Sequence, residues 1–241
     1  MKYLGAKHQI GDAISKYLVK KVPPDMVDGY LEPFCGSLGV FKYMVKYDYK
    51  KHIGSDIQPD IIQLWKELKK DELKLPKTMS EKKWKTIKSA KSPNSLKAVV
   101  GFGLSFGGQF FSGYIQKYAS SSGRNFYTEV KNSLKKIKSV IQKPTIKFYN
   151  KSYLSWKPQN MLIYCDPPYQ HTTGYSTGGF DHDKFWDTMR KWSKNNYIFI
   201  SEQKCPSDFK SVWSRKKRRT LNKRVRFTST EHLYIYKYGL L

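Results

Sequence analysis

The strongest constraint on the fold comes from two short, almost wholly apolar runs late in the chain. They are Met161-Leu162-Ile163-Tyr164-Cys165 and Tyr197-Ile198-Phe199-Ile200. Apolar runs of this length without alternation are typical of strands buried on both faces of a parallel sheet. Earlier, Tyr30-Leu31-Glu32 and His52-Ile53-Gly54-Ser55-Asp56 are strand candidates, and each is followed by helical spacing. Alternating strands and helices predict an α/β fold with a Rossmann-like, doubly wound, mainly parallel sheet.

The middle of the chain departs from this alternation. Residues 69–97 are rich in lysine, residues 101–114 mix glycine with aromatic side chains, and helical spacing resumes from Thr128 to Ile141. Strand character returns at Thr145. We therefore predict a mainly helical insertion at residues 66–142, within a domain formed by residues 1–65 and 143–241. Residues 224–238 alternate in polarity and predict a terminal β-hairpin.

The charge of the chain indicates a polyanionic partner. There are 45 Lys+Arg residues against 19 Asp+Glu, which gives a net charge of +26. An aromatic content of 15% excludes a disordered basic tail. Nucleic acid is the commonest polyanion that such a surface attracts, although charge alone does not separate DNA from RNA. Whether the chain is a monomer or a weak dimer is left open.

Other sequence features indicate the cellular location of the protein. No run approaches the roughly 20 apolar residues of a membrane span, and Met1–Gly5 does not begin like a signal peptide. The three cysteines, Cys35, Cys165 and Cys205, lie far apart without metal-ligand spacing. We expect a protein of the cytoplasm or host-cell interior, with no membrane, no metal and no disulfide.

Asp166-Pro167-Pro168-Tyr169 directly follows the apolar run 161–165. Side chains at the carboxyl end of a parallel strand face the ligand crevice. Two prolines stiffen the loop and have no N–H, so the loop carbonyls stay free as acceptors. An acid, a carbonyl and an aromatic plane suit a planar ring that carries an exocyclic amine. The alternative interpretation is a polar turn with Tyr169 packed in the core.

A glycine turn around Gly36 and Gly39 follows the first strand candidate. Glycine lets the backbone approach a ligand, and the next helix can offer N–H donors. Asp56 lies about 20 residues after Gly36, a spacing that suits a ribose-binding acid. The alternative for Asp56 is an N-cap of the following helix.

Several of these motifs occur in the order found in a known family. Tyr3-Leu4-Gly5-Ala6-Lys7, Glu32-Pro33-Phe34-Cys35-Gly36, Asp56 and Asp166-Pro167-Pro168-Tyr169 resemble the Dam-type, D12-class adenine-N6 DNA methyltransferases over nearly the whole chain. One departure is Leu38, where the family usually has a further glycine, and we expect Gly39 to substitute for it. Ser201-Glu202 also resembles, more weakly, the short motif that the family carries after the next strand.

The resemblance implies a cofactor and the residues that hold it. The cofactor is S-adenosyl-L-methionine, which Tyr3, Lys7, Phe34, Gly36, Asp56 and Asp166 would bind. The catalytic motif is Asp166, Pro167, Pro168 and Tyr169.

The family resemblance also implies that the insertion 66–142 recognises the DNA target. We place Arg124 and Asn125 at base edges, because their side chains suit guanine and adenine. Without the resemblance, the basic segment of Arg215, Lys216, Lys217, Arg218 and Arg219 already suggests phosphate contacts, with a solvated hairpin or a nuclear-import signal as alternatives.

The expected function is site-specific methyl transfer from S-adenosylmethionine to N6 of a flipped-out adenine in duplex DNA. A restriction-modification role would fit that activity. Two alternatives stay open: methylation of RNA adenine or another planar amine, and a basic DNA-binding protein without catalysis.

Overall fold

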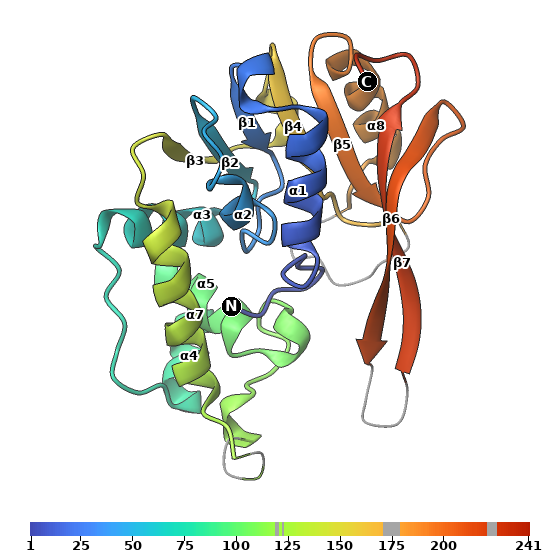
Figure 1. Ribbon diagram of the computed structural model, residues 1–241. Helices are drawn as coiled ribbons and strands as arrows, with labels where there is room; N and C mark the ends of the chain where they lie inside the picture. Colours follow the sequence, from blue (N-terminus) through green and yellow to red (C-terminus); the bar gives the residue numbers. More distant parts are fainter. Residues whose placement is uncertain (119–120, 122, 171–178, 221–225) are drawn as a thin grey trace.

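The computed structural model describes residues 1–118, 121, 123–170, 179–220 and 226–241, without the side chains of 217–220 and 226–228. In this part of the chain, seven strands form one sheet of order β3-β2-β1-β4-β5-β7-β6 (Figure 1). The five strands from β3 to β5 are parallel, and β7 and β6 join antiparallel. The predicted α/β class and doubly wound sheet are confirmed. The strands are β1 (Gly29–Glu32), β2 (His52–Asp56), β3 (Ile146–Asn150), β4 (Met161–Cys165), β5 (Tyr197–Glu202), β6 (Phe209–Thr220) and β7 (Arg226–Tyr236).

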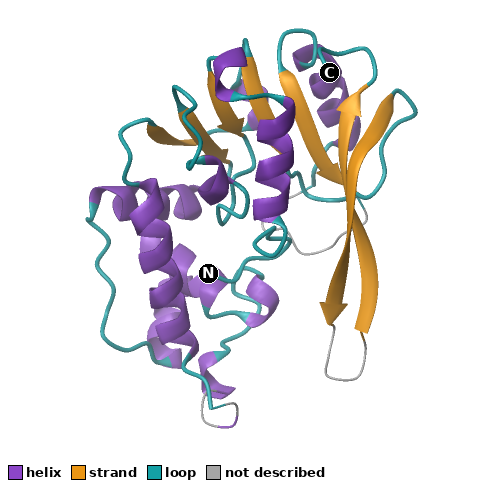
Figure 2. Cartoon of the chain, viewed as in Figure 1, coloured by secondary structure: helices purple, strands orange, loops and turns teal. Residues whose placement is uncertain are grey.

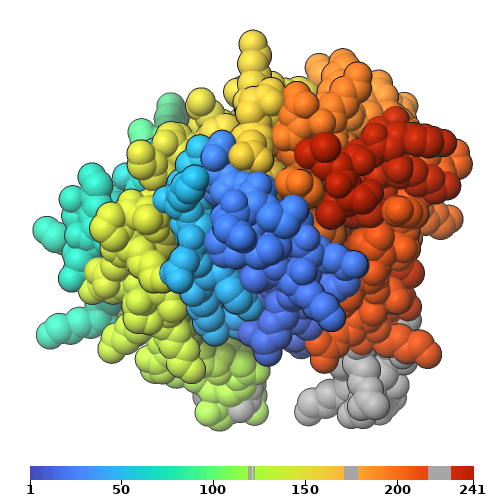
Figure 3. Space-filling model, turned by 45° about the horizontal axis from the view of Figure 1, so that its top comes forward, coloured from blue at the N-terminus to red at the C-terminus, as the bar shows by residue number. Residues whose placement is uncertain are grey.

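Helices lie on both faces of the sheet (Figure 2). In the space-filling view, the N-terminal helix α1 lies in the middle of one face, between the insertion and the C-terminal strands (Figure 3). The α-helices are α1 (Gly11–Lys21), α2 (Phe41–Met44), α3 (Pro59–Lys70), α4 (Glu81–Lys88), α5 (Ser95–Gly103), α7 (Phe126–Ile141) and α8 (His182–Trp192). The short 3-10 helices are η1 (Pro24–Met26), η2 (Phe106–Gly108), η3 (Gln116–Tyr118) and η4 (Tyr153–Ser155).

Successive side chains of β4 enter two different cores. Leu162 and Tyr164 belong to the large cluster that also contains Ile14 of α1. Ile163 and Cys165 belong to a second cluster, which the apolar face of α8 covers. Because neighbouring residues of a strand point to opposite faces, a strand covered on both sides must be apolar throughout. This is why the run 161–165 shows no alternation.

The segment between α3 and β3 is mainly helical, as predicted. Its side chains Val99 and Leu134 lie in the same apolar cluster as Tyr30 of the sheet, so the helices α4, α5 and α7 share a core with the strands. The boundary predicted after residue 65 falls inside α3, and the division into two domains stays a prediction. Phe102, Phe106 and Phe110 have the spacing of one helix face in the sequence, but α5 ends at Gly103 and Phe106 is exposed.

The C-terminal hairpin is confirmed, and it begins earlier than the sequence indicates. Its first strand is β6, which contains Arg215 and Lys216 and pairs with β7 through to Thr220. Figures 1 and 2 show the hairpin and the helices of the insertion extending from the sheet in the same direction, one on each side.

Leu38 has an unusual backbone conformation in the glycine loop. Its φ is 61°, in the left-handed region that favours glycine, and its side chain is completely buried. That Gly39 substitutes for the family's glycine stays a prediction. Leu38 itself takes the left-handed conformation. Gly39 instead allows the backbone of Lys7 to approach closely, because a Cβ at position 39 would lie 2.8 Å from the Lys7 backbone nitrogen.

This conformation predicts an unusual order of stability for variants of Leu38. Leu38→Ala should lower the free energy of unfolding by about 3 kcal/mol, because most of a buried side chain is removed. Leu38→Gly removes that side chain as well but relieves left-handed strain, so it should be more stable than the alanine variant by roughly 1 kcal/mol. Urea unfolding would measure both. Leu64, buried within α3, is the matched control, where glycine should instead be worse than alanine by about 1 kcal/mol. If the alanine variant were more stable than the glycine variant at both positions, backbone strain at Leu38 would be contradicted.

Candidate active site

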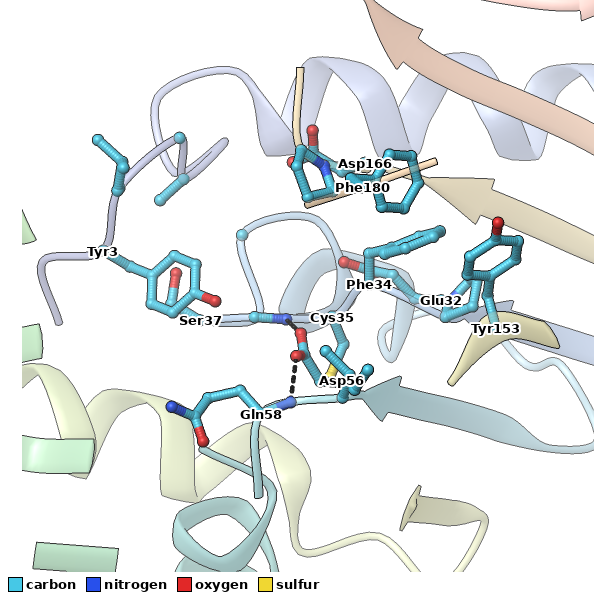
Figure 4. Close-up of a pocket in the computed structure, with 18 of the residues that line it drawn as sticks. Tyr3, Glu32, Phe34, Cys35, Ser37, Asp56, Gln58, Tyr153, Asp166 and Phe180 are labelled. Carbon is cyan, nitrogen blue, oxygen red and sulfur yellow. Dashed lines mark hydrogen bonds between the residues drawn. The ribbon is translucent and has the colours of Figure 1, made fainter. Parts of the chain in front are cut away.

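A pocket of ≈ 310 Å³ lies at the carboxyl ends of β1, β2 and β4, where the N-terminal segment also reaches (Figure 4). Its position agrees with the rule that ligands of open α/β sheets bind beyond the carboxyl ends of the strands. All six residues predicted to bind the cofactor line it: Tyr3, Lys7, Phe34, Gly36, Asp56 and Asp166. Their roles stay predictions, but the fold brings them into one cavity.

Asp56 organises the glycine loop of this pocket. Its Oδ2 accepts a hydrogen bond of 2.9 Å from the Gly36 N–H, and its Oδ1 accepts one of 2.9 Å from the Gln58 N–H (Figure 4). Burial raises the pKa of this carboxyl. The N-cap of α3 is Gln58, whose side chain accepts from the Asp60 N–H. Asp56 therefore ties the end of β2 to the loop after β1 rather than capping the helix itself.

The loop is also held from two other directions. Trp65 of α3 donates its indole N–H to the Gly36 carbonyl over 2.8 Å. Gly36 has a φ of +40°, and a Cβ there would lie 3.0 Å from the Tyr3 ring. Glycine is therefore required both by the backbone conformation and by the tyrosine packed against it.

Lys7 is a buried cation at the centre of the site, with an exposed fraction of 3%. Its Nζ lies 2.6 Å from Asp166 Oδ1 and 3.6 Å from Glu231 Oε1, and it also donates to the Gly5 carbonyl. A buried ammonium needs such partners, because its desolvation is costly. The N-terminal motif is thus joined to the loop after β4 and to β7.

The predicted catalytic motif is divided between the pocket and the core. Asp166 and Pro168 line the pocket, whereas Pro167 and Tyr169 are buried. The Tyr169 hydroxyl donates to Glu231, and the Lys7 Nζ lies 4.6 Å from the centre of its ring. The stacking role of Tyr169 stays a prediction.

Glu231 was missed by the sequence analysis. The signal that could have found it is its isolation, because it is the sole acidic residue after Asp208 in a strongly basic stretch.

Aromatic residues that the sequence analysis also missed form one end of the pocket. The Phe34 ring lies 5.3 Å from that of Tyr153 and 5.9 Å from that of Phe180, measured between centroids. Figure 4 shows these three rings together, beside Glu32. Tyr153 and Phe180 come from different connections, and no local spacing links them to Phe34.

Glu32 is a further buried acid of the pocket. It accepts a 2.8 Å hydrogen bond from the Tyr30 hydroxyl, and burial raises its pKa well above the usual range. With Glu32, the charged side chains of the lining are four acids and two lysines: Glu32, Asp56, Asp166, Asp181, Lys7 and Lys184. Even without a charge on Glu32, three aspartates exceed two lysines, so the pocket is opposite in sign to the chain as a whole.

The two predicted base-reading residues lie at the start of α7. Arg124 is exposed and forms two hydrogen bonds with Glu129, of 2.7 and 2.6 Å, over the ring of Phe126. Asn125 is the N-cap of α7, and its Oδ1 accepts from the Thr128 N–H over 3.0 Å. Both side chains thus have partners within the chain, and base contacts by either stay a prediction.

The basic segment lies on β6. Arg215 and Lys216 are exposed. The side chains of Lys217, Arg218 and Arg219 fall outside the described part of the chain. Phosphate contacts by this segment stay a prediction.

The family model that matches this sequence is that of the D12 class N6 adenine-specific DNA methyltransferases, over residues 3–96 and 107–226. This match covers most of the chain. The chain belongs to this methyltransferase family.

Two curated relatives are type II methyltransferases. M.FokI of Planomicrobium okeanokoites is 24% identical in an alignment of 216 residues that covers 79% of this chain and 32% of the relative. M.MjaIII of Methanocaldococcus jannaschii is 38% identical over 72 residues, which are 30% of this chain and 25% of the relative. The chain therefore spans about a third or less of the length of the relatives it matches.

Among solved structures, the magnesium protoporphyrin IX methyltransferase of Synechocystis PCC 6803, with bound SAM, is 8% identical. The TM-score is 0.40, and the alignment covers 95% of this chain and 79% of that one. At this level of likeness, membership of the methyltransferase family rests on the sequence match.

Two further findings concern only the described residues. None of their helices is both long enough and apolar enough to cross a membrane. Their His, Cys, Asp and Glu side chains form no group of three that could hold a metal ion.

Glu202, at the end of β5, should make stability depend on pH. Burial raises its pKa from 4.5 to about 7. Between these values the folded chain holds a proton that the unfolded chain has released, so stability falls as the pH rises through this range. Relative to Glu202→Gln, which cannot ionise, the wild type should lose about 1–3 kcal/mol between pH 4.5 and pH 8.

Urea unfolding at several pH values would measure this difference. Exposed Glu72 is the matched control, and Glu72→Gln should follow the wild type at every pH. Parallel curves for the wild type and Glu202→Gln would contradict a raised pKa at Glu202.

Proposed function

We propose that this protein transfers a methyl group from S-adenosylmethionine to N6 of adenine in duplex DNA. The observation that carries the proposal is the position of Asp166. It lies at the carboxyl end of β4, where the loop suited to an exocyclic amine meets the pocket that the predicted cofactor residues line. Family membership supports the same reaction, substrate and cofactor.

The residues of the pocket suit this cofactor. S-adenosylmethionine supplies an electrophilic methyl group on a cationic sulfur. The excess of carboxylates in the lining favours a cation, although the rest of the chain is strongly basic. The rings of Phe34, Tyr153 and Phe180 offer an apolar end to a planar base. Each Asp56 oxygen accepts a backbone hydrogen bond, and a carboxylate oxygen can accept more than one, for example from a ribose hydroxyl.

Asp166 and the prolines act on the target amine. The carboxylate and the Pro167 carbonyl accept the two N6 hydrogens, which turns the nitrogen lone pair out of conjugation with the ring and toward the methyl group. The positive charge that develops on N6 is stabilised by the carboxylate. The protein contributes alignment and electrostatics without a covalent intermediate.

The target adenine must leave the base stack to reach Asp166. Tyr169 follows Asp166 in the same loop and is the aromatic residue of the Asp166-Pro167-Pro168-Tyr169 motif, so we assign it to stacking on the flipped base. The hairpin and the insertion, which extend from the sheet on both sides of the N-terminal segment, are the surfaces assigned to DNA (Figure 1).

Asp166→Ala should lower methyl transfer by more than about a hundredfold, because the amine loses its acceptor. Non-specific DNA binding should survive, because the basic surface is unchanged. The measurement is methyl incorporation from labelled S-adenosylmethionine, with N6-methyladenine identified by mass spectrometry of the nucleosides. Activity of the variant within about tenfold of the wild type would exclude this role for Asp166.

The same assay separates the remaining functions. Duplex DNA, duplex RNA and single-stranded RNA serve as parallel substrates, and transfer to RNA alone would replace the proposed substrate. Calorimetry with S-adenosylmethionine distinguishes an enzyme from a DNA-binding protein without catalysis. A wild-type chain that binds DNA but neither binds the cofactor nor transfers methyl would overturn the proposal.

The basic segment predicts a change in salt dependence. Neutralising Arg215, Lys216, Lys217, Arg218 and Arg219 should flatten the slope of log K against log salt by about 0.9 for each phosphate that the protein no longer neutralises. Site preference should be kept, because phosphate contacts position the protein and base contacts specify the sequence. Binding to cognate and scrambled duplexes across a salt series measures both.

Lys20 and Lys21, exposed at the end of α1, provide the control, and their neutralisation should leave the slope nearly unchanged. An unaltered slope in the hairpin variant would mean that the segment is only solvated.

A further inference from the structure

Glu231 is a buried acid to which the proposed methyl transfer, as described above, assigns no role. It lies on β7 with an exposed fraction of 4%. Burying a carboxylate is costly unless it is paired and hydrogen-bonded, so its partners indicate why it is retained.

Its partners belong to the two motifs of the active site. The Tyr169 hydroxyl of the catalytic loop donates to Glu231 Oε1. The Lys7 Nζ of the N-terminal motif lies 3.6 Å from the same oxygen and 2.6 Å from Asp166 Oδ1. One buried lysine therefore lies between two carboxylates, and one of these carboxylates also holds the catalytic tyrosine.

The charges in this group bear on the transfer step. With Asp166 alone, Lys7 would form a neutral pair, and a neutral pair does little to stabilise positive charge on N6. Lys7 with both carboxylates carries a net charge of −1. Lys7 and Glu231 are buried, where charge interactions are weakly screened. Glu231 thus offsets the lysine, and Asp166 keeps a negative field toward the amine.

The hydrogen bond from Tyr169 adds a second effect. The ring lies beneath the Lys7 ammonium, and its hydroxyl is held at the far end by Glu231. A ring fixed at both places has less freedom to turn, and preorganised groups accelerate reactions.

We infer that Glu231 is a positioning residue of the active site, which balances the charge of Lys7 and holds Tyr169 by its hydroxyl. The inference rests on the proposed methyl transfer. It also gives the hairpin a part in catalysis, because Glu231 lies directly across from Arg215, the first residue of the basic segment. The hairpin that is predicted to contact DNA and the catalytic loop thus meet at the Glu231 side chain.

The test compares Glu231→Gln with Glu231→Asp by steady-state methylation kinetics. Glutamine keeps the length and loses the charge, whereas aspartate keeps the charge and shortens the side chain. If charge is what Glu231 supplies, Glu231→Gln should lower kcat by about 10- to 100-fold, and Glu231→Asp should keep more activity. KM for S-adenosylmethionine and affinity for DNA should stay within about threefold for both variants.

Asp28→Asn is the matched control for loss of one carboxylate. Asp28 is exposed, precedes β1 and lies 3.9 Å from Lys50, away from the carboxyl edge of the sheet. This variant should have the kcat of the wild type.

A purely structural role for Glu231 predicts the opposite order, with glutamine closer to the wild type than aspartate and with losses that follow thermal stability. That order, or a wild-type kcat in Glu231→Gln, would overturn this inference alone. A wild-type chain that transfers no methyl group would overturn the proposed function and this inference with it.

If Glu231→Gln does not fold, Tyr169→Phe carries the test. It removes the hydroxyl that Glu231 holds and keeps the aromatic plane, and kcat should fall by about three- to tenfold. An unchanged kcat in that variant would overturn the positioning role.

Discussion

The ion pair between Lys7 and Asp166 is the contact on which the site depends, because it joins segments 159 residues apart in the sequence. The Lys7 ammonium, 3% exposed, could not be buried without a partner except at a large desolvation cost, so the N-terminal segment must dock where the loop after β4 ends. Docking brings Tyr3 against Gly36 and the Lys7 backbone against Gly39, and these contacts close the pocket at that side. The glycine loop, the N-terminal motif and the catalytic loop are therefore mutually dependent.

Hydrophobic patterns along the sequence predicted those strands and helices whose burial depends on residues close together in the chain. The doubly covered strand β4 had to be apolar throughout, and α3 and α7 showed their buried faces as helical spacing. Spacing alone proposed Asp56, whereas Tyr3 and Lys7 came from the family resemblance. The left-handed conformation of Leu38 could not be predicted from its residue type, because leucine adopts it only where the surrounding core outweighs the strain.

The residues that sequence reasoning missed are those that only the tertiary structure brings together. Tyr153 and Phe180 reach Phe34 from separate connections, and Glu231 reaches Lys7 through the pairing of β7 with β5. The end of α5 at Gly103 has a similar origin. The spacing of Phe102, Phe106 and Phe110 fits a helix, but Phe111 and Phe110 pack against Gly101, so the chain has to turn back there.

The distribution of charge suits the two proposed ligands, which have opposite signs. A chain with a net charge of +26 attracts polyanions such as the proposed DNA substrate, and the same field would repel the proposed cationic cofactor. Solvent screens the exposed lysines beyond about 10 Å, whereas Asp166, which is only 19% exposed, acts over a short distance with less screening. Three aspartates against two lysines in the lining thus make the pocket locally attractive to a cation inside a basic protein. Glu231 adds a further negative charge beside Lys7, at the point of the hairpin where the basic segment begins with Arg215.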